Sequence, residues 1–463
     1  MKKKITLSYA LITLAVLTAF LLVSLLVLNI PIVIALFLSW IILACFALGL
    51  GYTLSEIESS AADMIKFGAG VFPLLLAIGC MVSIWLCSGA VPTLIYWGLK
   101  LITPRMFLFL AFVICAVVSI PTGTSWGTMG TVGVAMFGVG VGFGIKPALV
   151  VGAIVAGAHV GDCFSPASDI PLLTSTVCGV SLSDHVKHSI KSVAPAFLIA
   201  SVIYLILGLT SSGATTDTSA LSGMIADLES NMKLSVLTLL PIVVVIVLLV
   251  MRQSSLWAIL AGCIVGGAIA VFYQGYSVTE VGTFMASGFK IETGNTYLDP
   301  ILNRGGLNSM LELVSIALIA LGMGGILKGM NVLDIIVESM SHKVRNTKGL
   351  TAATAIGDIA CQLMVSTGYF AITIVGTLIT PLYNKLGYKS VNASRAISNL
   401  NSAFCVFVPW ALTPLIIVSY FGVPIISIMP YVFFNIALIV VELFYGFTGI
   451  AMEKEVSTDK ESA

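Results

Sequence analysis

The chain has 463 residues, of which 58% are hydrophobic and only 9% are charged, and its formal net charge is +1. Soluble globular proteins carry about 25% charged residues, so this composition excludes a soluble protein. A net charge this close to zero gives no indication of nucleic-acid binding. Long continuous apolar runs indicate helices that cross a lipid bilayer. We therefore expect an all-α polytopic membrane protein.

The first half of the chain, residues 1–210, consists mainly of apolar runs. They lie at residues 5–29, 31–51, 68–88, 106–120, 127–143, 147–179 and 193–210. A polar segment at 53–66 follows the second run, and we expect a polar loop before the last run, with His185 and His188 in it. Residues 211–232, which are rich in Ser and Thr and contain no Lys or Arg, are the predicted extracytoplasmic connection between the halves.

The second half, residues 233–450, has a similar pattern. Its apolar runs lie at 233–251, 256–273, 309–327, 350–365, 369–384, 390–421 and 425–447. The polar tail at 451–463 is predicted to be short, disordered and cytoplasmic.

A fixed offset relates the two halves. Adding 243 to first-half positions pairs three glycines and two prolines without a gap: Gly133 with Gly376, Gly144 with Gly387, Gly179 with Gly422, Pro166 with Pro409 and Pro171 with Pro414. Apolar residues match easily by chance in such a chain, but glycines and prolines match less easily. The offset therefore predicts an internal repeat.

The distribution of Lys and Arg predicts how the chain is threaded, because basic short loops stay in the cytoplasm. If residues 104–144 and 348–386 form re-entrant hairpins, the 184–191 loop and both termini are cytoplasmic and the 211–232 connection lies outside. Each half then makes about five crossings, an odd number, so the repeats are inverted. Inverted repeats with broken helices are a transporter design, with substrate bound near the midplane. We expect a multi-pass protein of the cell membrane.

Polar residues interrupt the apolar chain at 157–179, which reads GAHVGDCFSPASDIPLLTSTVCG. Burying a carboxylate such as Asp162 or Asp169 at membrane depth costs roughly 2.5–3.5 kcal/mol, so such residues persist mainly where they face a polar cavity or pathway. Broken backbone at that depth is tolerated in the same places. We interpret this stretch as half of a transport site for a small cation.

Four irregular stretches would converge in an inverted-repeat fold: two hairpin tips, 121–128 and 365–369, and two helix breaks, 159–171 and 402–414. A hard cation such as sodium prefers oxygen ligands, which hydroxyls, carbonyls and carboxylates supply. The candidate ion- or substrate-binding residues are Thr124, Ser125, His159, Asp162, Ser165, Ser168, Asp169, Thr367, Tyr369 and Asn401, with Asp162 and Asp169 as the sodium ligands.

The candidates have structural alternatives. Asp162 is the first candidate for an ion or proton carrier and Asp169 the second, and either carboxylate can instead cap the half-helix that follows it. His159 either faces the same cavity or is a hydrogen-bonded structural histidine. Asp358, inside the apolar run 350–365, is either a site or gating residue or a packing partner for Arg395.

The sequence contains no P-loop GxxxxGK[ST], no HExxH and no nucleophile elbow. It therefore gives no indication of an enzyme or of an ATP-driven pump, and we expect no cofactor apart from sodium as the transported or coupling ion.

From these residues, the sequence resembles the NhaC family of sodium/proton antiporters, part of the ion transporter superfamily. The resemblance covers residues 68–447 and rests on GTSWGTMGTVGVA (123–135), GAIVAGAHVGDCFSPASD (152–169), STGYFAI (366–372) and other segments in the family's order. It implies an inverted-repeat fold with re-entrant hairpins, a homodimer, and cation exchange by movement of a transport domain against a scaffold.

The sequence departs from the family pattern in the first helix break. The family is expected to read Gly-Asp-Lys-Met-Ser-Pro-Leu-Ser-Asp-Thr-Thr-Asn where this chain reads GDCFSPASDIPL (161–172), so a lysine and three polar side chains are missing. Two hypotheses follow. One is sodium/proton antiport with Asp162 as the shared carrier. The alternative is a sodium- or proton-coupled carrier or exchanger of an organic acid or amino acid, whose carboxylate is held at residues 122–128 and 365–369.

Overall fold

The structure is a computed structural model that describes residues 5–28, 30–210, 218–295, 298–341, 344–365 and 367–455. In these ranges the chain is built from helices, with one isolated β-bridge between Tyr388 and Lys454. By length and composition, six of the described helices can cross a membrane, or up to ten spans form if each bent helix pair counts as one. The prediction of an all-α polytopic membrane protein with broken helices is therefore confirmed.

The first half contains eleven named α-helices. They are α1 (Leu7–Leu22), α2 (Ile32–Gly49), α3 (Leu54–Phe67), α4 (Val71–Cys87), α5 (Ala90–Leu101), α6 (Pro104–Thr122), α7 (Ser125–Thr128), α8 (Val134–Gly142), α9 (Pro147–Phe164), α10 (Asp169–Val177) and α11 (Leu182–Thr210). The π-helical turn Met129–Gly133 joins α7 to α8.

The connection and second half contain thirteen more. They are α12 (Thr218–Asn231), α13 (Leu240–Val250), α14 (Ser255–Ile269), α15 (Val278–Ser287), α16 (Asp299–Leu302), α17 (Leu311–Gly329), α18 (Val332–Ser341), α19 (Thr347–Val365), α20 (Gly368–Lys385), α21 (Ser390–Phe404), α22 (Leu412–Phe421), α23 (Ile425–Ile428) and α24 (Phe433–Thr448).

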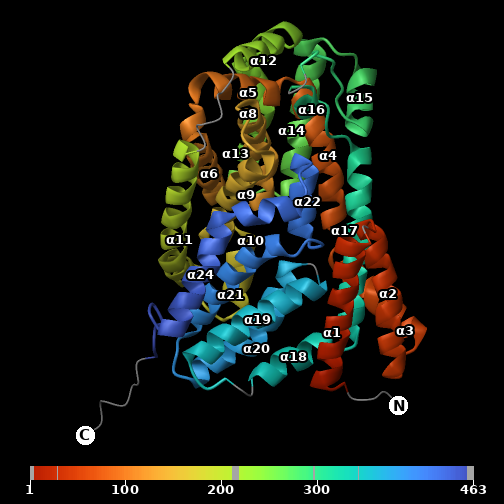
Figure 1. Ribbon diagram of the computed structural model, residues 1–463, viewed down its shortest axis with the longest axis vertical. Helices are drawn as coiled ribbons and strands as arrows, with labels where there is room; N and C mark the ends of the chain where they lie inside the picture. Colours follow the sequence, from red (N-terminus) through yellow and green to blue (C-terminus); the bar gives the residue numbers. More distant parts are fainter. Residues whose placement is uncertain are drawn as a thin grey trace.

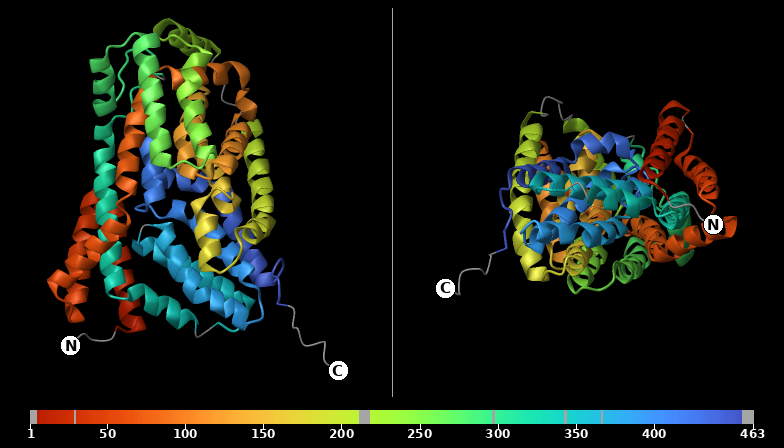
Figure 2. Two further views of the ribbon diagram at one scale, coloured as in Figure 1. Left: turned by 180° about the vertical axis from the view of Figure 1, so that it is seen from behind. Right: turned by 90° about the horizontal axis from the view of Figure 1, so that it is seen from below.

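The helices are arranged along one long axis (Figure 1). Helix α12 lies at the upper end, whereas α1 begins and α24 ends toward the lower end. The helices α9, α10, α21 and α22 occupy the middle, and α18 to α20 lie below them. Seen from below, α19 and α20 cross the centre of the molecule, with α11 on one side and α1 to α3 on the other (Figure 2).

Two hairpins and two broken helices form the centre. Helices α6 and α7 make one hairpin and α19 and α20 the other. The first broken helix is α9 and α10, interrupted at residues 165–168, which include Pro166. The second is α21 and α22, which are bent by 52°. Both interruptions lie within the stretches that the sequence predicts.

Glycines let the first hairpin approach the first broken helix closely. A Cβ atom at Gly157 would collide with the Phe112 carbonyl oxygen of α6, and one at Gly161 with the Ser119 carbonyl oxygen. Ser119 then bridges the two helices, because its hydroxyl donates to the Ala158 carbonyl and accepts from the Gly161 N–H at 3.1 Å. Small residues at a helix interface allow this backbone approach inside membranes.

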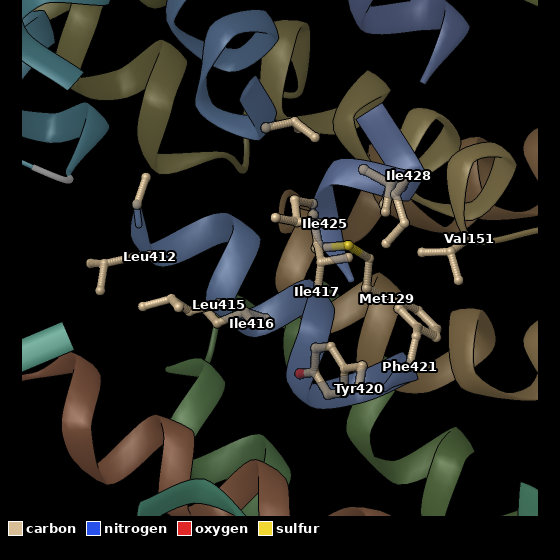
Figure 3. Close-up of a cluster of buried hydrophobic side chains, with 14 of the residues drawn as sticks. Met129, Val151, Leu412, Leu415, Ile416, Ile417, Tyr420, Phe421, Ile425 and Ile428 are labelled. Atoms are coloured by element: carbon tan, nitrogen blue, oxygen red, sulfur yellow. The ribbon is translucent and has the colours of Figure 1, made fainter. Parts of the chain in front are cut away.

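Helix α22 fixes the second broken helix to the first half. Its apolar side chains, among them Ile417 and Phe421, gather with Met129 and with Val151 of α9 in a fully buried cluster (Figure 3). Helix α22, which follows the second break, is therefore packed against the first half of the chain.

The offset of 243 residues also relates the backbones of the two halves. Helices α6, α9 and α10 begin at residues 104, 147 and 169, and α19, α21 and α22 begin 243 positions later, at 347, 390 and 412. Left-handed glycines recur with similar φ angles, +74° at Gly144 and +75° at Gly387, and +66° at Gly179 and +63° at Gly422. These coincidences support a repeat, and its inversion across a membrane stays a prediction.

The polar segment before residue 193 is helical, in contrast to the predicted loop. Helix α11 begins at Leu182, and His185 and His188 lie in its first two turns with 0% and 3% of their side chains exposed. His185 Nδ1 lies 2.7 Å from the Ser394 hydroxyl and His188 Nε2 lies 3.1 Å from Asn392 Oδ1, both on α21. Polar residues are abundant here because α11 packs on a polar helix.

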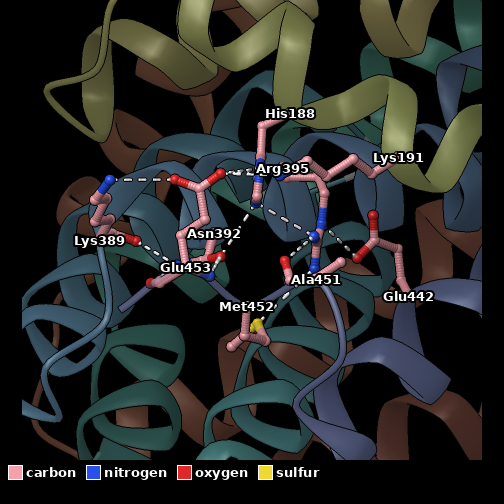
Figure 4. A network of polar contacts seen from close by, with 9 residues as sticks. All are labelled: His188, Lys191, Lys389, Asn392, Arg395, Glu442, Ala451, Met452 and Glu453. Atoms are coloured by element: carbon pink, nitrogen blue, oxygen red, sulfur yellow. Dashed lines mark hydrogen bonds and ion pairs between the residues drawn. The ribbon is translucent and has the colours of Figure 1, made fainter. Parts of the chain in front are cut away.

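A buried polar network joins α11, α21 and α24 (Figure 4). Arg395 Nε and Glu442 Oε2 form an ion pair at 3.3 Å, with each side chain only 1% exposed. Asn399 Nδ2 donates to Glu442 Oε1 at 2.6 Å, and Arg395 Nη1 donates to the Ala451 carbonyl at 2.8 Å. Both members of the ion pair therefore have further hydrogen-bonding partners.

The first residues of the tail, which the sequence analysis expected to be disordered, pack against this network. Glu453 pairs with Lys191 at 2.9 Å and with Lys389 at 3.3 Å. The hydrogen bond from Lys191, together with the one from Lys389, lowers the pKa of Glu453 to about 2, so this carboxylate stays ionised at any physiological pH. Residues 456–463 lie outside the described residues.

The buried ion pair gives a prediction about stability. Glu442→Gln leaves Arg395 buried without its counter-charge, a change that costs about 3–5 kcal/mol in proteins. We expect a clear fall in the melting temperature of the purified protein in detergent, measured by intrinsic fluorescence.

The matched control is Asp63→Asn, which breaks an exposed pair with Lys66 whose side chains are 69% and 77% exposed. Such a pair is worth about 0–1 kcal/mol, so the melting temperature should hardly move. Equal small shifts for both variants would contradict the stabilising role of the Arg395–Glu442 pair.

Candidate functional site

The hairpin tips and helix breaks meet around one cavity of about 650 Å³. Its wall includes Thr122–Trp126 from the first tip, Pro166–Ile170 from the first break, Thr367–Tyr369 from the second tip and Ala411–Thr413 from the second break. The four stretches that were predicted from the sequence to converge therefore meet at this cavity. Ser366 lies outside the described residues.

Asp162 lies at the C-terminal end of α9 and faces the cavity. Its Oδ1 accepts a hydrogen bond from the Ser125 backbone N–H, at the start of α7, at 3.0 Å. The left-handed Gly123 (φ +65°) brings the hairpin tip to the helix break, because a Cβ there would collide with the Ala167 backbone. The hairpin tip therefore holds one carboxylate oxygen of Asp162 and leaves this half-buried side chain at the cavity wall.

Asp169 is the first residue of α10, and its side chain is exposed toward the cavity. Ser168 caps this helix, because its hydroxyl accepts from the Ile170 N–H at 3.3 Å. Asp162 and Tyr369 line the same cavity as Asp169. A cation in this cavity would be attracted by both carboxylates.

The second tip and second broken helix are joined in a similar way. Asn401 on α21 donates through Nδ2 to the Gly368 carbonyl at 3.1 Å, and a Cβ at Gly368 would collide with the Asn401 side-chain oxygen. Thr367 and Tyr369 flank this contact and line the cavity. Trp126 Nε1 reaches from the first tip to the Thr413 hydroxyl at 3.4 Å. Both halves thus contribute hydroxyl and amide groups to one cavity.

Two candidates from the sequence analysis are not among the lining residues. The Ser165 hydroxyl is fully buried, donates to the Ile120 carbonyl at 2.5 Å and accepts from the Ala167 N–H at 3.1 Å. His159 is also buried and hydrogen-bonds through Nδ1 to the Val155 carbonyl at 2.8 Å. Both side chains hydrogen-bond to backbone carbonyls, and the choice between the two roles of His159 stays a prediction. The other eight candidates line the cavity.

The structure brings in residues that the sequence analysis did not select. Gln362 on α19 lines the cavity, as do Arg252 and its neighbours in the turn between α13 and α14. Asp358 lies behind Gln362, where Gln362 Nε2 donates to Asp358 Oδ2 at 2.6 Å. The alternative that paired Asp358 with Arg395 is wrong, because Arg395 pairs with Glu442.

The donor atoms around the cavity suit a hard cation rather than a transition metal. In the part of the chain that the structure describes, no group of three or more His, Cys, Asp or Glu side chains could hold a metal ion. The cavity instead presents two carboxylates, hydroxyls and helix ends of both kinds: the C-terminal end of α6 and the N-terminal ends of α10, α20 and α22. Oxygen atoms and C-terminal helix ends are favourable for a small monovalent cation, and N-terminal helix ends are favourable for an anionic group.

Comparison with known proteins agrees with this chemistry. The model of the Na+/H+ antiporter family matches residues 1–209 and 177–450. The Na(+)/H(+) antiporter NhaC of Alkalihalophilus pseudofirmus is 34% identical over 99% of both chains. The malate-2H(+)/Na(+)-lactate antiporter of Bacillus subtilis is 32% identical over 96% of this chain and 95% of its own. The arginine/ornithine antiporter ArcD of Halobacterium salinarum is 30% identical over 90% and 86%.

The contact between hairpin tip and helix break gives a second prediction. Gly123→Ala adds a Cβ that collides with the Ala167 backbone, so the tip must move away from the break. We expect this variant to have a lower melting temperature than Gly144→Ala, which has the same left-handed strain of roughly 1–2 kcal/mol but nothing within 4 Å of its Cβ. Equal melting temperatures would show that the tip is not held in this position.

Proposed function

Because the chain belongs to the Na+/H+ antiporter family, we propose that it exchanges sodium ions for protons across the membrane and that the Asp162 carboxylate carries both in turn. The observation that carries this proposal is the position of Asp162. It is a carboxylate at a helix break, held by a hairpin tip and facing a cavity that both halves of the chain line.

The exchange follows from competition for one group. An ionised Asp162 binds sodium with help from the cavity hydroxyls and from Asp169. A proton on the same carboxyl removes the charge that holds sodium, so sodium and proton exclude each other. If the cavity opens to the opposite side of the membrane only when Asp162 carries sodium or a proton, each sodium ion that Asp162 carries across is balanced by a proton that it carries in the opposite direction.

We further propose that the protein lies in the cell membrane as a homodimer, with both termini in the cytoplasm. The basic segments near residues 184–191 and 343–348 support this orientation by the positive-inside rule. The start of α1 and the end of α24 lie at one end of the molecule and α12 lies at the other, which agrees with it (Figure 1). The resemblance to the NhaC family supports the dimer.

Everted membrane vesicles test the role of Asp162. After respiration has acidified the vesicle interior, millimolar sodium should dissipate the pH gradient in wild type and fail to do so in Asp162→Asn, because the amide cannot carry a proton or a charge. Asp169→Asn should keep the exchange but need a higher sodium concentration for half-maximal exchange. Asp63→Asn serves as a control for expression. If sodium and lithium leave the pH gradient of wild-type vesicles unchanged, the antiport proposal is wrong. If Asp162→Asn dissipates the gradient as wild type does, only the site assignment is wrong.

Competition also sets the pH dependence. Once protons occupy the shared carboxyl, the sodium concentration that gives half-maximal exchange should rise about tenfold for each unit of decreasing pH, because binding of one ligand weakens the other reciprocally. The measurement is the sodium dependence of the exchange rate in the same vesicles at several pH values. A half-maximal concentration that does not change with pH would rule out a shared site.

A second candidate function is exchange of an organic acid or amino acid. A volume of about 650 Å³ is far larger than one sodium ion needs and falls within the range of small-molecule pockets. Arg252 lines this cavity and makes no ion pair with a described residue, so its guanidinium is available to a carboxylate ligand. Two relatives named above are exchangers of such solutes.

Proteoliposomes distinguish the two functions. We would measure uptake of labelled malate, lactate, arginine and ornithine against the same unlabelled solute, with and without a sodium gradient. Organic exchange predicts uptake that Arg252→Gln reduces at least tenfold for the anionic solutes. Sodium/proton exchange alone predicts no uptake of any of them, with sodium-dependent proton movement unchanged in Arg252→Gln.

A further inference from the structure

Asp358 is a second buried carboxyl group next to the cavity. It lies in the middle of α19, and its side chain is 0% exposed. Asn401 Nδ2 donates to its Oδ1 at 2.8 Å, and Gln362 Nε2 donates to its Oδ2 at 2.6 Å. Asp358 is not a member of any ion pair within the described ranges. The buried Arg395 pairs with Glu442 instead. Ionisable groups inside membrane helices are costly and mark ion or proton pathways.

The two partners of Asp358 connect it to the proposed transport site. Gln362 and Asn401 both line the cavity that Asp162 faces. They are also bonded to each other, because Gln362 Nε2 donates to the Asn401 carbonyl at 3.1 Å, and Asn401 is bonded to the second hairpin tip at Gly368. The carboxamide side chains of Gln362 and Asn401 are therefore in contact with Asp358 on one side and with the cavity on the other.

The same contact recurs in the first half, where no carboxylate accompanies it. The offset of 243 maps Gln362 to Ser119 and Asn401 to Ala158, and Ser119 donates to the Ala158 carbonyl as Gln362 does to that of Asn401. The position equivalent to Asp358 is Cys115, which is fully buried among apolar residues. The helix contact therefore does not need an acid, so a structural role in that contact does not explain Asp358.

The chemistry around Asp358 suits a proton better than sodium. Both of its oxygens already accept an amide N–H, and those hydrogens would repel a cation. A proton needs only one lone pair. A carboxamide can also turn its oxygen toward a protonated carboxyl and its NH₂ group toward an ionised one. Gln362 and Asn401 can therefore satisfy Asp358 in both states, whereas an arginine or lysine partner would favour the ionised state alone.

We propose that Asp358 is a second proton-carrying site, which takes up and releases a proton in each cycle while Asp162 exchanges a proton for sodium. This proposal rests on the sodium/proton exchange proposed above. The balance per cycle is two protons moved inward, one on each carboxyl, and one sodium ion moved outward on Asp162. One positive charge then enters in each cycle, so the membrane potential drives sodium export.

The test is the proton-to-sodium ratio of the purified protein in proteoliposomes. The membrane potential is clamped with potassium and valinomycin, and the potential at which labelled sodium shows no net flux is found for fixed gradients. We expect a ratio of two for wild type and for Asp358→Glu, and a ratio of one, independent of potential, for Asp358→Asn. The control Asp334→Asn, a half-buried carboxylate on the neighbouring α18, should keep the ratio of two.

The outcomes separate this inference from the function on which it rests. If the wild-type protein shows no sodium/proton exchange, the proposed function is wrong. An exchanging wild type with a ratio of one, or an Asp358→Asn variant that keeps a ratio of two, would overturn the role of Asp358 alone.

If Asp358→Asn folds but does not transport, infrared difference spectroscopy across a pH step replaces the flux measurement. We expect the carboxyl band of a buried titrating acid to persist in Asp162→Asn and to disappear in the double variant with Asp358→Asn. Persistence of the band in the double variant would overturn the proposal.

Discussion

The centre of this structure depends on one constraint: every backbone group that a broken helix frees must find a partner away from water. Ser165 meets it with its hydroxyl, which accepts the Ala167 N–H freed at the first break and donates to the Ile120 carbonyl in the last turn of α6. The Asp162 carboxylate meets it at the hairpin tip by accepting the Ser125 N–H. The same bonds that make the break tolerable also fix the carboxylate at the cavity wall, so the site and the fold have one cause.

The sequence predicted the breaks well because their signals are local. A proline, a carboxylate and hydroxyls inside an apolar run are visible without tertiary information, and a fixed offset located the second break from the first. The sequence could not say which way a side chain points. Ser165 and His159 share the predicted first break with Asp162. Ser165 bonds to the Ile120 carbonyl of α6, which packing brings within reach, and His159 bonds to the Val155 carbonyl one turn earlier in its own helix.

Three errors arose because a sequence does not show which polar side chains face one another inside the protein. His185 and His188 suggested a loop, but the helix that carries them packs on α21, a helix whose polar residues are almost all buried. Gln362 gave no signal as a single amide in an apolar run. Arg395 was offered as the partner of Asp358, and its true partner, Glu442, lies near the end of the chain.

The close approach at Gly123 has a mechanical consequence. The first hairpin tip and the first helix break touch backbone to backbone, without side chains between them that could flex. Two segments joined in this way move as one rigid body, so Asp162 travels together with the amide that holds it. A movement that exposes the cavity to the other side of the membrane would therefore keep this contact, whereas a contact made by the end of a long side chain, such as that of Trp126 with Thr413, could break.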